Sequence, residues 1–193
     1  MDMITLDLNP ALTLTDEQFA QICQNNRDLR FERTAHGELV IMAPTGGETG
    51  SRNLSLGSQL WQWNQTQQLG KGFDSSTGFK LPNGSTRSPD VAWVRLERWN
   101  ALNPEQQRRF VPLCPDFAVE LKSPSDDLAD LQTKMQEYID NGLQLGWLID
   151  PEQQRVEIYR PGQTVEGLTR PKTLADETVL PGFVLDLADI FES

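Results

Sequence analysis

One short apolar segment of the 193-residue chain carries two charged residues whose types and spacing could do chemistry. The segment spans residues 117–122, and it predicts a buried strand in which Glu120 and Lys122 share one side. At strand spacing the two side chains leave the backbone about 6.6 Å apart. A charged pair inside an otherwise apolar strand breaks a local rule, and such breaks are expected at functional sites.

A second acid precedes another predicted strand. Asp90 follows Pro89 at the entry to a strand that we expect to neighbour residues 117–122. Two converging carboxylates, Asp90 and Glu120, make a hard-oxygen site suited to Mg²⁺ or Mn²⁺. A bound divalent ion lowers the pKa of its water and neutralises charge on a phosphoryl oxygen, and a nearby lysine can stabilise charge in the transition state. These residues therefore predict hydrolysis of phosphodiester bonds, and Glu48, at the start of a predicted helix, could complete the metal shell.

Each of these residues also has a purely structural explanation. Asp90 is a residue type common in turns, and Glu48 could simply stabilise the N-terminus of its helix. Glu120 and Lys122 could form a solvated ion pair on an edge strand. The apolar residues that flank this pair favour a central strand instead.

The wider sequence around these residues resembles the PD-(D/E)xK nuclease signature, in the form found in the Uma-type family of "putative restriction endonucleases". Asp90 follows a proline, and Glu120-Leu121-Lys122 comes thirty residues later. Further blocks that resemble this family occur in order at residues 37–44, 88–92, 119–126, 134–142 and 146–151. The resemblance covers about residues 30–162.

The resemblance implies an α/β fold with a restriction-endonuclease-like core, in which a central mixed β-sheet is flanked by helices. The acids are expected at the ends of two core strands. The resemblance further implies that Asp90 and Glu120 bind the metal ion, Mg²⁺ or alternatively Mn²⁺, and that Lys122 assists the attacking water.

The resemblance also assigns roles to residues on two predicted helices. Glu48 matches an acid that the first core helix often supplies as a metal ligand. Many relatives have a histidine directly after that acid, whereas this chain has Thr49, which puts any helper role of that position in doubt. Gln132 and Lys134, on the helix after residues 117–122, could face the site as supporting residues.

The rest of the chain predicts the elements that must position these residues, and we expect one domain over residues 1–193. It comprises an N-terminal arm and helix (residues 1–30), a core (31–162) and a C-terminal extension (163–193). The expected local signals are a helix cap at Thr15, a hairpin turn at His36-Gly37, a helical apolar stripe of Leu56, Leu60 and Trp63, a helix that starts at Ser123 (or Ser125) and ends near Asn141, and a strand pair around Thr173 and Val179.

Composition and charge exclude several classes of protein. The chain has 17 Lys and Arg against 28 Asp and Glu, a net charge of −11, so we do not expect it to bind nucleic acid by bulk positive charge, although a local basic channel is allowed. One histidine and two separated cysteines, Cys23 and Cys114, cannot build a zinc site alone. No apolar run reaches the roughly 20 residues of a membrane span, and the N-terminus lacks the basic region of a signal peptide. We expect a cytoplasmic protein with no membrane partner.

The sequence therefore predicts a Mg²⁺-dependent endonuclease that acts on nucleic acid, with double-stranded DNA as the expected substrate and water as the nucleophile. The alternative is a binding or interaction module on the same fold with little or no catalysis, and the net charge of −11 motivates it. A homodimer is compatible with the first reading, because enzymes that cut both strands often pair two active sites.

Overall fold

A six-stranded mixed sheet forms the centre of the structure, a computed structural model that describes residues 4–192. Its strand order is β11-β10-β9-β8-β7-β4. Strands β8 and β9 run parallel, and the other neighbouring pairs described in this sheet are antiparallel. The six strands are β4 (Gly70–Asp74), β7 (Val91–Arg95), β8 (Phe117–Leu121), β9 (Leu145–Asp150), β10 (Arg155–Tyr159) and β11 (Glu166–Thr169).

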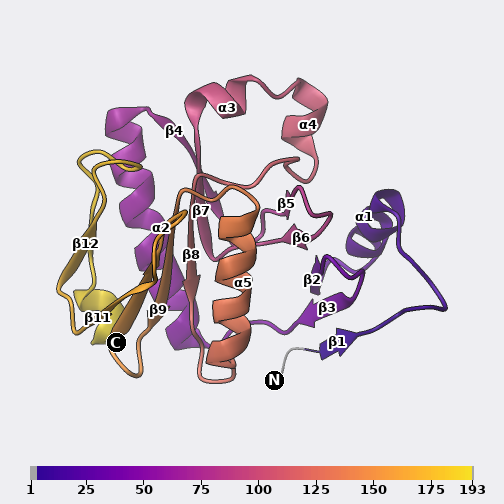
Figure 1. The fold of residues 1–193 in the computed structure, drawn as a ribbon, viewed down its shortest axis with the longest axis horizontal. Coiled ribbons are helices and arrows are strands. Elements are labelled where there is room, and N and C mark those ends of the chain that lie inside the picture. Colours follow the sequence, from indigo (N-terminus) through magenta and orange to yellow (C-terminus); the bar gives the residue numbers. More distant parts are fainter. Residues whose placement is uncertain (1–3, 193) are drawn as a thin grey trace.

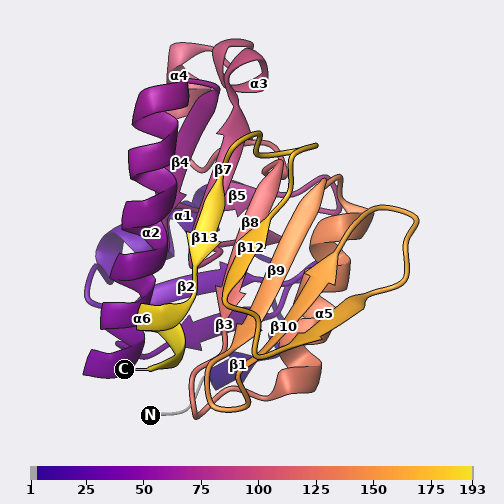
Figure 2. The same ribbon diagram turned by 90° about the vertical axis from the view of Figure 1, so that its left-hand side faces the viewer.

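Two helices cover the two faces of this sheet (Figures 1 and 2). Helix α2 (Gly47–Gln67) packs on one face through the predicted stripe of Leu56, Leu60 and Trp63. Helix α5 (Leu128–Asp140) packs on the other face and forms the crossover that the parallel β8–β9 pair requires. The predicted fold class, a central mixed sheet flanked by helices, is confirmed.

A second, five-stranded sheet lies on the far side of α5, so that α5 stands between the two sheets (Figure 1). Its order is β1-β3-β2-β6-β5, and the predicted hairpin is confirmed as β2 paired with β3 around Gly37, whose φ is +87°. The N-terminal strands β2 and β3 therefore lie next to α5, a helix about a hundred residues later in the sequence. The members are β1 (Ile4–Leu6), β2 (Arg30–Arg33), β3 (Leu39–Met42), β5 (Phe79–Lys80) and β6 (Thr86–Arg87).

The start of α5 differs from the prediction. Neither Ser123 nor Ser125 caps the helix, because the backbone N–H of Ser123 donates to the carboxylate of Asp126 (2.8 Å) and closes a separate turn. The helix begins only at Leu128, after Asp127, whose side chain accepts a hydrogen bond from the backbone N–H of Ala129. The predicted cap at Thr15 is confirmed, since Thr15 caps α1 (Asp16–Asn25).

The C-terminal strand pair is β12 (Thr173–Ala175) with β13 (Val184–Asp186), so the predicted strand around Val179 is wrong. The Asp176 carboxylate accepts the backbone N–H of Val179 and holds this segment in a turn instead. The remaining helices of the described chain are α3 (Leu96–Asn100), α4 (Pro104–Arg108) and α6 (Ala188–Phe191).

Some expectations for the chain as a whole stay predictions. Residues 1–3 of the expected N-terminal arm, and residue 193 of the extension, lie outside the described residues. The division into arm, core and extension within one domain is likewise still a prediction. Within residues 4–192, no helix combines the length and the apolar character that crossing a membrane would require.

The first testable prediction concerns the packing of β4 against β7. A Cβ atom at Gly70 would collide with the carbonyl oxygen of Val94 and the indole of Trp93, so Gly70→Ala should lower the free energy of unfolding by about 1–3 kcal/mol. At Gly72, on the same strand, the nearest atom to such a Cβ is 3.9 Å away, on Leu60. Urea unfolding of Gly70→Ala and Gly72→Ala tests this, and equal stability of the two variants would contradict the packing described.

Candidate active site

Two neighbouring strands bring Asp90 and Glu120 together. Strands β7 and β8 pair in antiparallel register with Val91 opposite Val119, so Asp90, just before β7, reaches the end of β8 that carries Glu120. The Oδ2 atom of Asp90 accepts a hydrogen bond from the backbone N–H of Leu121 (2.9 Å). The prediction that these two strands are neighbours is therefore confirmed.

Glu120 is buried, with 4% of its surface exposed, and its partners come from α5. Its Oε1 atom lies 2.9 Å from the ammonium of Lys134 and accepts a hydrogen bond from the Tyr138 hydroxyl, also at 2.9 Å. Lys134, which the sequence analysis named as a supporting residue, thus contacts Glu120 directly. Its position on α5 lets it reach the sheet on one side and the N-terminal strands on the other.

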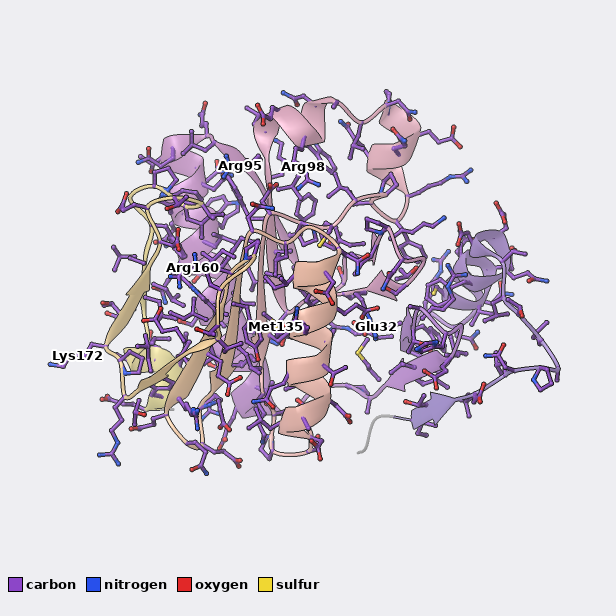
Figure 3. The ribbon with its side chains drawn as sticks, viewed as in Figure 1. Glu32, Arg95, Arg98, Met135, Arg160 and Lys172 are labelled. Atoms are coloured by element: carbon purple, nitrogen blue, oxygen red, sulfur yellow. The ribbon has the colours of Figure 1, made fainter. Side chains whose placement is uncertain are left out.

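The partner of Lys134 on the other side is Glu32 of β2, which lies beside α5 (Figure 3). One Glu32 oxygen lies 2.9 Å from the Lys134 ammonium and accepts the backbone N–H of Ser88 at 2.8 Å, while the other lies 3.1 Å from Arg87. The sequence analysis did not identify Glu32. In the sequence it is a single acid within one strand of the predicted hairpin, and nothing in that pattern indicates a functional site. The contact joins residues that lie about a hundred positions apart.

Burial dominates the electrostatics of the two acids. It raises the pKa of Glu120 to about 7, with Asp90 and Glu32 acting in the same direction and Lys134 opposing them. Burial also raises the pKa of Asp90, against the lowering effects of its Leu121 hydrogen bond and Lys134. Burial would raise the pKa of Glu32 too, but Lys134 and Arg87 together bring it below its usual value. The site therefore holds Glu32 ionised and leaves Glu120 short of positive charge.

We refer to Lys134 and the five charged residues around it as the buried charge cluster. When all are ionised, its four carboxylates outnumber its two cations, and a divalent cation would remove this imbalance. Two carboxylates are enough for such a site, because Mg²⁺ usually binds one or two carboxylates together with waters and substrate phosphates. The donor set of Asp90 and Glu120 therefore fits a Mg²⁺ ion. The buried charge cluster consists of Glu32, Arg87, Asp90, Glu120, Lys134 and Glu137.

Glu48 and Lys122 have other partners. Glu48 is 74% exposed in the first turn of α2, where its carboxylate lies 3.7 Å from Arg52. No group of three or more His, Cys, Asp or Glu residues within the described chain is arranged to hold a metal ion, so the structure does not bring Glu48 to Asp90 and Glu120. The Lys122 ammonium donates to the Ser123 carbonyl (3.2 Å) and lies 3.7 Å from Glu152.

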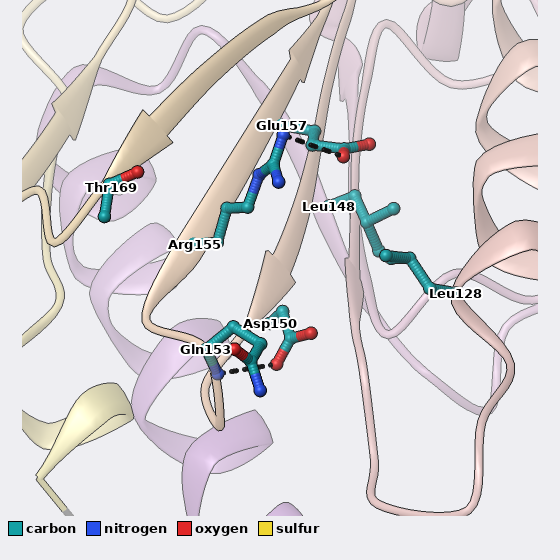
Figure 4. A pocket seen from close by; sticks show the side chains of 7 residues that line it. All are labelled: Leu128, Leu148, Asp150, Gln153, Arg155, Glu157 and Thr169. Atoms are coloured by element: carbon teal, nitrogen blue, oxygen red, sulfur yellow. Dashed lines mark hydrogen bonds and ion pairs between the residues drawn. The ribbon is translucent and has the colours of Figure 1, made fainter.

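Gln132 points to a different acid. Its amide donates to both oxygens of Glu157 (2.9 and 3.0 Å), and the Tyr159 hydroxyl donates to the same carboxylate (2.7 Å). Glu157 lines a cavity of about 270 Å³ that does not include Asp90 or Glu120 (Figure 4). The structure therefore separates Gln132 from the candidate site. The cavity is lined by Leu128, Leu148, Asp150, Gln153, Arg155, Glu157 and Thr169.

Helix α2 contributes Asn53 to the site, a residue that sequence reasoning missed. The Asn53 side-chain NH₂ donates to Oδ1 of Asp90 (3.0 Å). Its own oxygen is buried and has no hydrogen-bond partner among the residues that the structure describes. A buried acceptor without a partner costs about 1–3 kcal/mol. The sequence does contain one indication of its position. Asn53 lies three residues before Leu56 and seven before Leu60, which places it on the side of α2 that faces the sheet.

Comparison with known proteins assigns this fold and site to a family. The profile of the family Uma2, described as "Putative restriction endonuclease", matches residues 16–188. The chain belongs to the Uma2 family. Proteins with a restriction-endonuclease-like fold generally use divalent metal ions, and the description of Uma2 is that of a nuclease, an enzyme class whose substrates are nucleic acids.

A solved structure supports the fold of this Uma2 chain. It resembles the crystal structure of "a putative nuclease belonging to DUF820" from Anabaena variabilis ATCC 29413, with a TM-score of 0.72 and 21% sequence identity. The match covers 84% of this chain and 89% of the Anabaena chain. The restriction-endonuclease-like fold predicted from the sequence is thus confirmed. No curated protein matches the Uma2 chain significantly.

The second testable prediction separates the two lysines by stability. Lys134→Ala would leave the buried carboxylates of Glu32 and Glu120 without their shared cation, so the free energy of unfolding should fall by about 3–5 kcal/mol. Lys122→Ala removes an ion pair of 3.7 Å with the half-exposed Glu152 together with the packing of a side chain that is 12% exposed, so it should cost less, about 1–2 kcal/mol. Urea unfolding measures both, and a loss for Lys122→Ala as large as that for Lys134→Ala would refute this assignment.

Proposed function

We propose that this Uma2 chain is a Mg²⁺-dependent endonuclease that hydrolyses phosphodiester bonds of DNA. The observation that carries the proposal is the meeting of Asp90 and Glu120 on neighbouring strands, inside a cluster with more carboxylates than cations. The nuclease description of the family supports the reaction class. The proposal includes double-stranded DNA as the substrate and a pair of chains that supply one site to each strand.

Asp90 and Glu120 are the proposed metal ligands, with Mg²⁺ as the ion and Mn²⁺ as a substitute. When bound, a divalent ion supplies a water of lowered pKa and neutralises charge on the phosphoryl oxygen. Lys134 acts as a positioning residue, because its ammonium is already shared between Glu120 and Glu32. It holds one oxygen of Glu120, together with the Tyr138 hydroxyl, and so fixes the direction of that carboxylate.

Lys122 is the proposed catalytic lysine. It directly follows β8, two residues after Glu120, and its backbone N–H continues the sheet by donating to the Ile149 carbonyl (2.8 Å). Its ammonium has looser partners than that of Lys134, the closest acid being Glu152 at 3.7 Å. It is therefore available to stabilise the negative charge that develops on the attacked phosphate and to assist the incoming water.

The third testable prediction concerns the two carboxylates. Supercoiled plasmid should be nicked in the presence of Mg²⁺ or Mn²⁺ and left intact with EDTA, and Asp90→Asn or Glu120→Gln should slow nicking by about 100-fold or more. A parallel reaction on RNA tests the choice of DNA. Absence of metal-dependent cleavage by the wild type, or unchanged rates in both variants, would refute the proposed function.

The fourth testable prediction concerns the ammonium of Lys122. Lys122→Met keeps the apolar stem of the side chain and removes the charge, so it should slow nicking by about 100-fold while Mn²⁺ binding and the unfolding curve stay close to those of the wild type. Lys172→Met is the matched control, because Lys172 is exposed and distant from the site (Figure 3). Equal nicking rates for the two lysine variants would remove Lys122 from the proposal.

A further inference from the structure

The contribution of α2 to the candidate site comes from Asn53 and not from Glu48. Glu48 points to solvent in the first turn of the helix and pairs with Arg52. Asn53, five residues later, contacts Asp90 through a hydrogen bond of 3.0 Å from its NH₂ group to Oδ1. The other oxygen of Asp90 is held by the backbone N–H of Leu121, so Asp90 is fixed between α2 and β8.

Asp90 also determines which way the Asn53 amide faces. An ionised carboxylate only accepts hydrogen bonds, so the NH₂ group faces Asp90 and the amide oxygen is left to bind another partner. That oxygen is buried and has no partner within the described residues. Buried acceptors in folded proteins nearly always have a partner. A group that is not part of the chain is therefore the natural partner of this oxygen.

A cation suits this position better than a hydrogen-bond donor alone. Amide oxygens are hard ligands and coordinate the same ions as carboxylates. A third carboxylate next to Asp90 and Glu120 would increase a surplus of negative charge that already exists in the buried charge cluster. An uncharged oxygen ligand completes the coordination without this cost.

We propose that Asn53 is the third protein ligand of the cation, through its amide oxygen, beside Asp90 and Glu120. This inference rests on the proposed function, since it adds a residue to the metal site proposed above. It replaces Glu48 as the residue that α2 supplies. Through its NH₂ group Asn53 also orients Asp90, so one side chain performs two tasks.

The experiment is titration of the metal-free protein with Mn²⁺ by isothermal calorimetry, without nucleic acid. Asn53→Ala should weaken Mn²⁺ binding by about 10-fold or more, a loss of the size that metal sites show when a supporting residue is removed. Asn53→Asp supplies an oxygen ligand but no donor to Asp90, so it should bind Mn²⁺ within about 3-fold of the wild type. Glu48→Ala is the matched control from the same helix and should bind as the wild type does.

Thermal melting gives a second readout that does not depend on activity. Asn53→Asp places a carboxylate next to Asp90, so it should melt at a lower temperature than the wild type without Mn²⁺ and recover when Mn²⁺ is added. If Asn53→Asp weakens Mn²⁺ binding as much as Asn53→Ala, the residue only orients Asp90 and its role as a ligand is refuted. Wild-type affinity in Asn53→Ala, or weakened binding in Glu48→Ala, likewise overturns the inference and leaves the proposed function standing. A wild-type protein that binds no Mn²⁺ overturns both.

Discussion

The shared ammonium of Lys134 is the interaction on which the rest of the site depends. It lies 2.9 Å from an oxygen of Glu32 and 2.9 Å from an oxygen of Glu120, and both acids are almost wholly buried. Burying any one of these charges alone would be strongly unfavourable, so the three must come together. Because they belong to β2, β8 and α5, this requirement connects the N-terminal sheet to the central sheet through the helix between them.

The same arrangement leaves the site short of positive charge. The single positive charge of Lys134 is shared by Glu32 and Glu120, and the negative charge of Asp90 raises the pKa of Glu120 further. Burial raises the pKa of Glu120 to about 7, so a divalent cation would compete with a proton for this carboxylate near neutral pH. A cation held there would supply locally the attraction for a phosphate group that the surface of a chain with net charge −11 lacks.

The sequence predicted contacts between neighbouring strands of the central sheet better than contacts between the two sheets. The approach of Asp90 and Glu120 followed from the expectation that their strands are neighbours and from the family resemblance, and the antiparallel pairing of β7 with β8 confirms that the two strands are neighbours. Glu32 could not be predicted, because it reaches the site from another sheet and no local pattern encodes a contact over about a hundred residues. The sequence around Ser123 is typical of a helix N-cap. In the structure its backbone N–H instead donates to Asp126, and α5 begins only at Leu128.

Helical geometry explains the two supporting residues that the sequence placed together and the structure separates. Gln132 and Lys134 are two positions apart on α5, and at about 100° per residue their side chains leave the helix on opposite flanks. In the sheet beneath, Glu120 and Glu157 both lie opposite Leu148, one on each side, so each flank of α5 meets one buried acid. Lys134 therefore pairs with Glu120, and Gln132 with Glu157. Only one flank of α5 faces Asp90. It is the flank that carries the positive charge of Lys134, and it also faces Glu32.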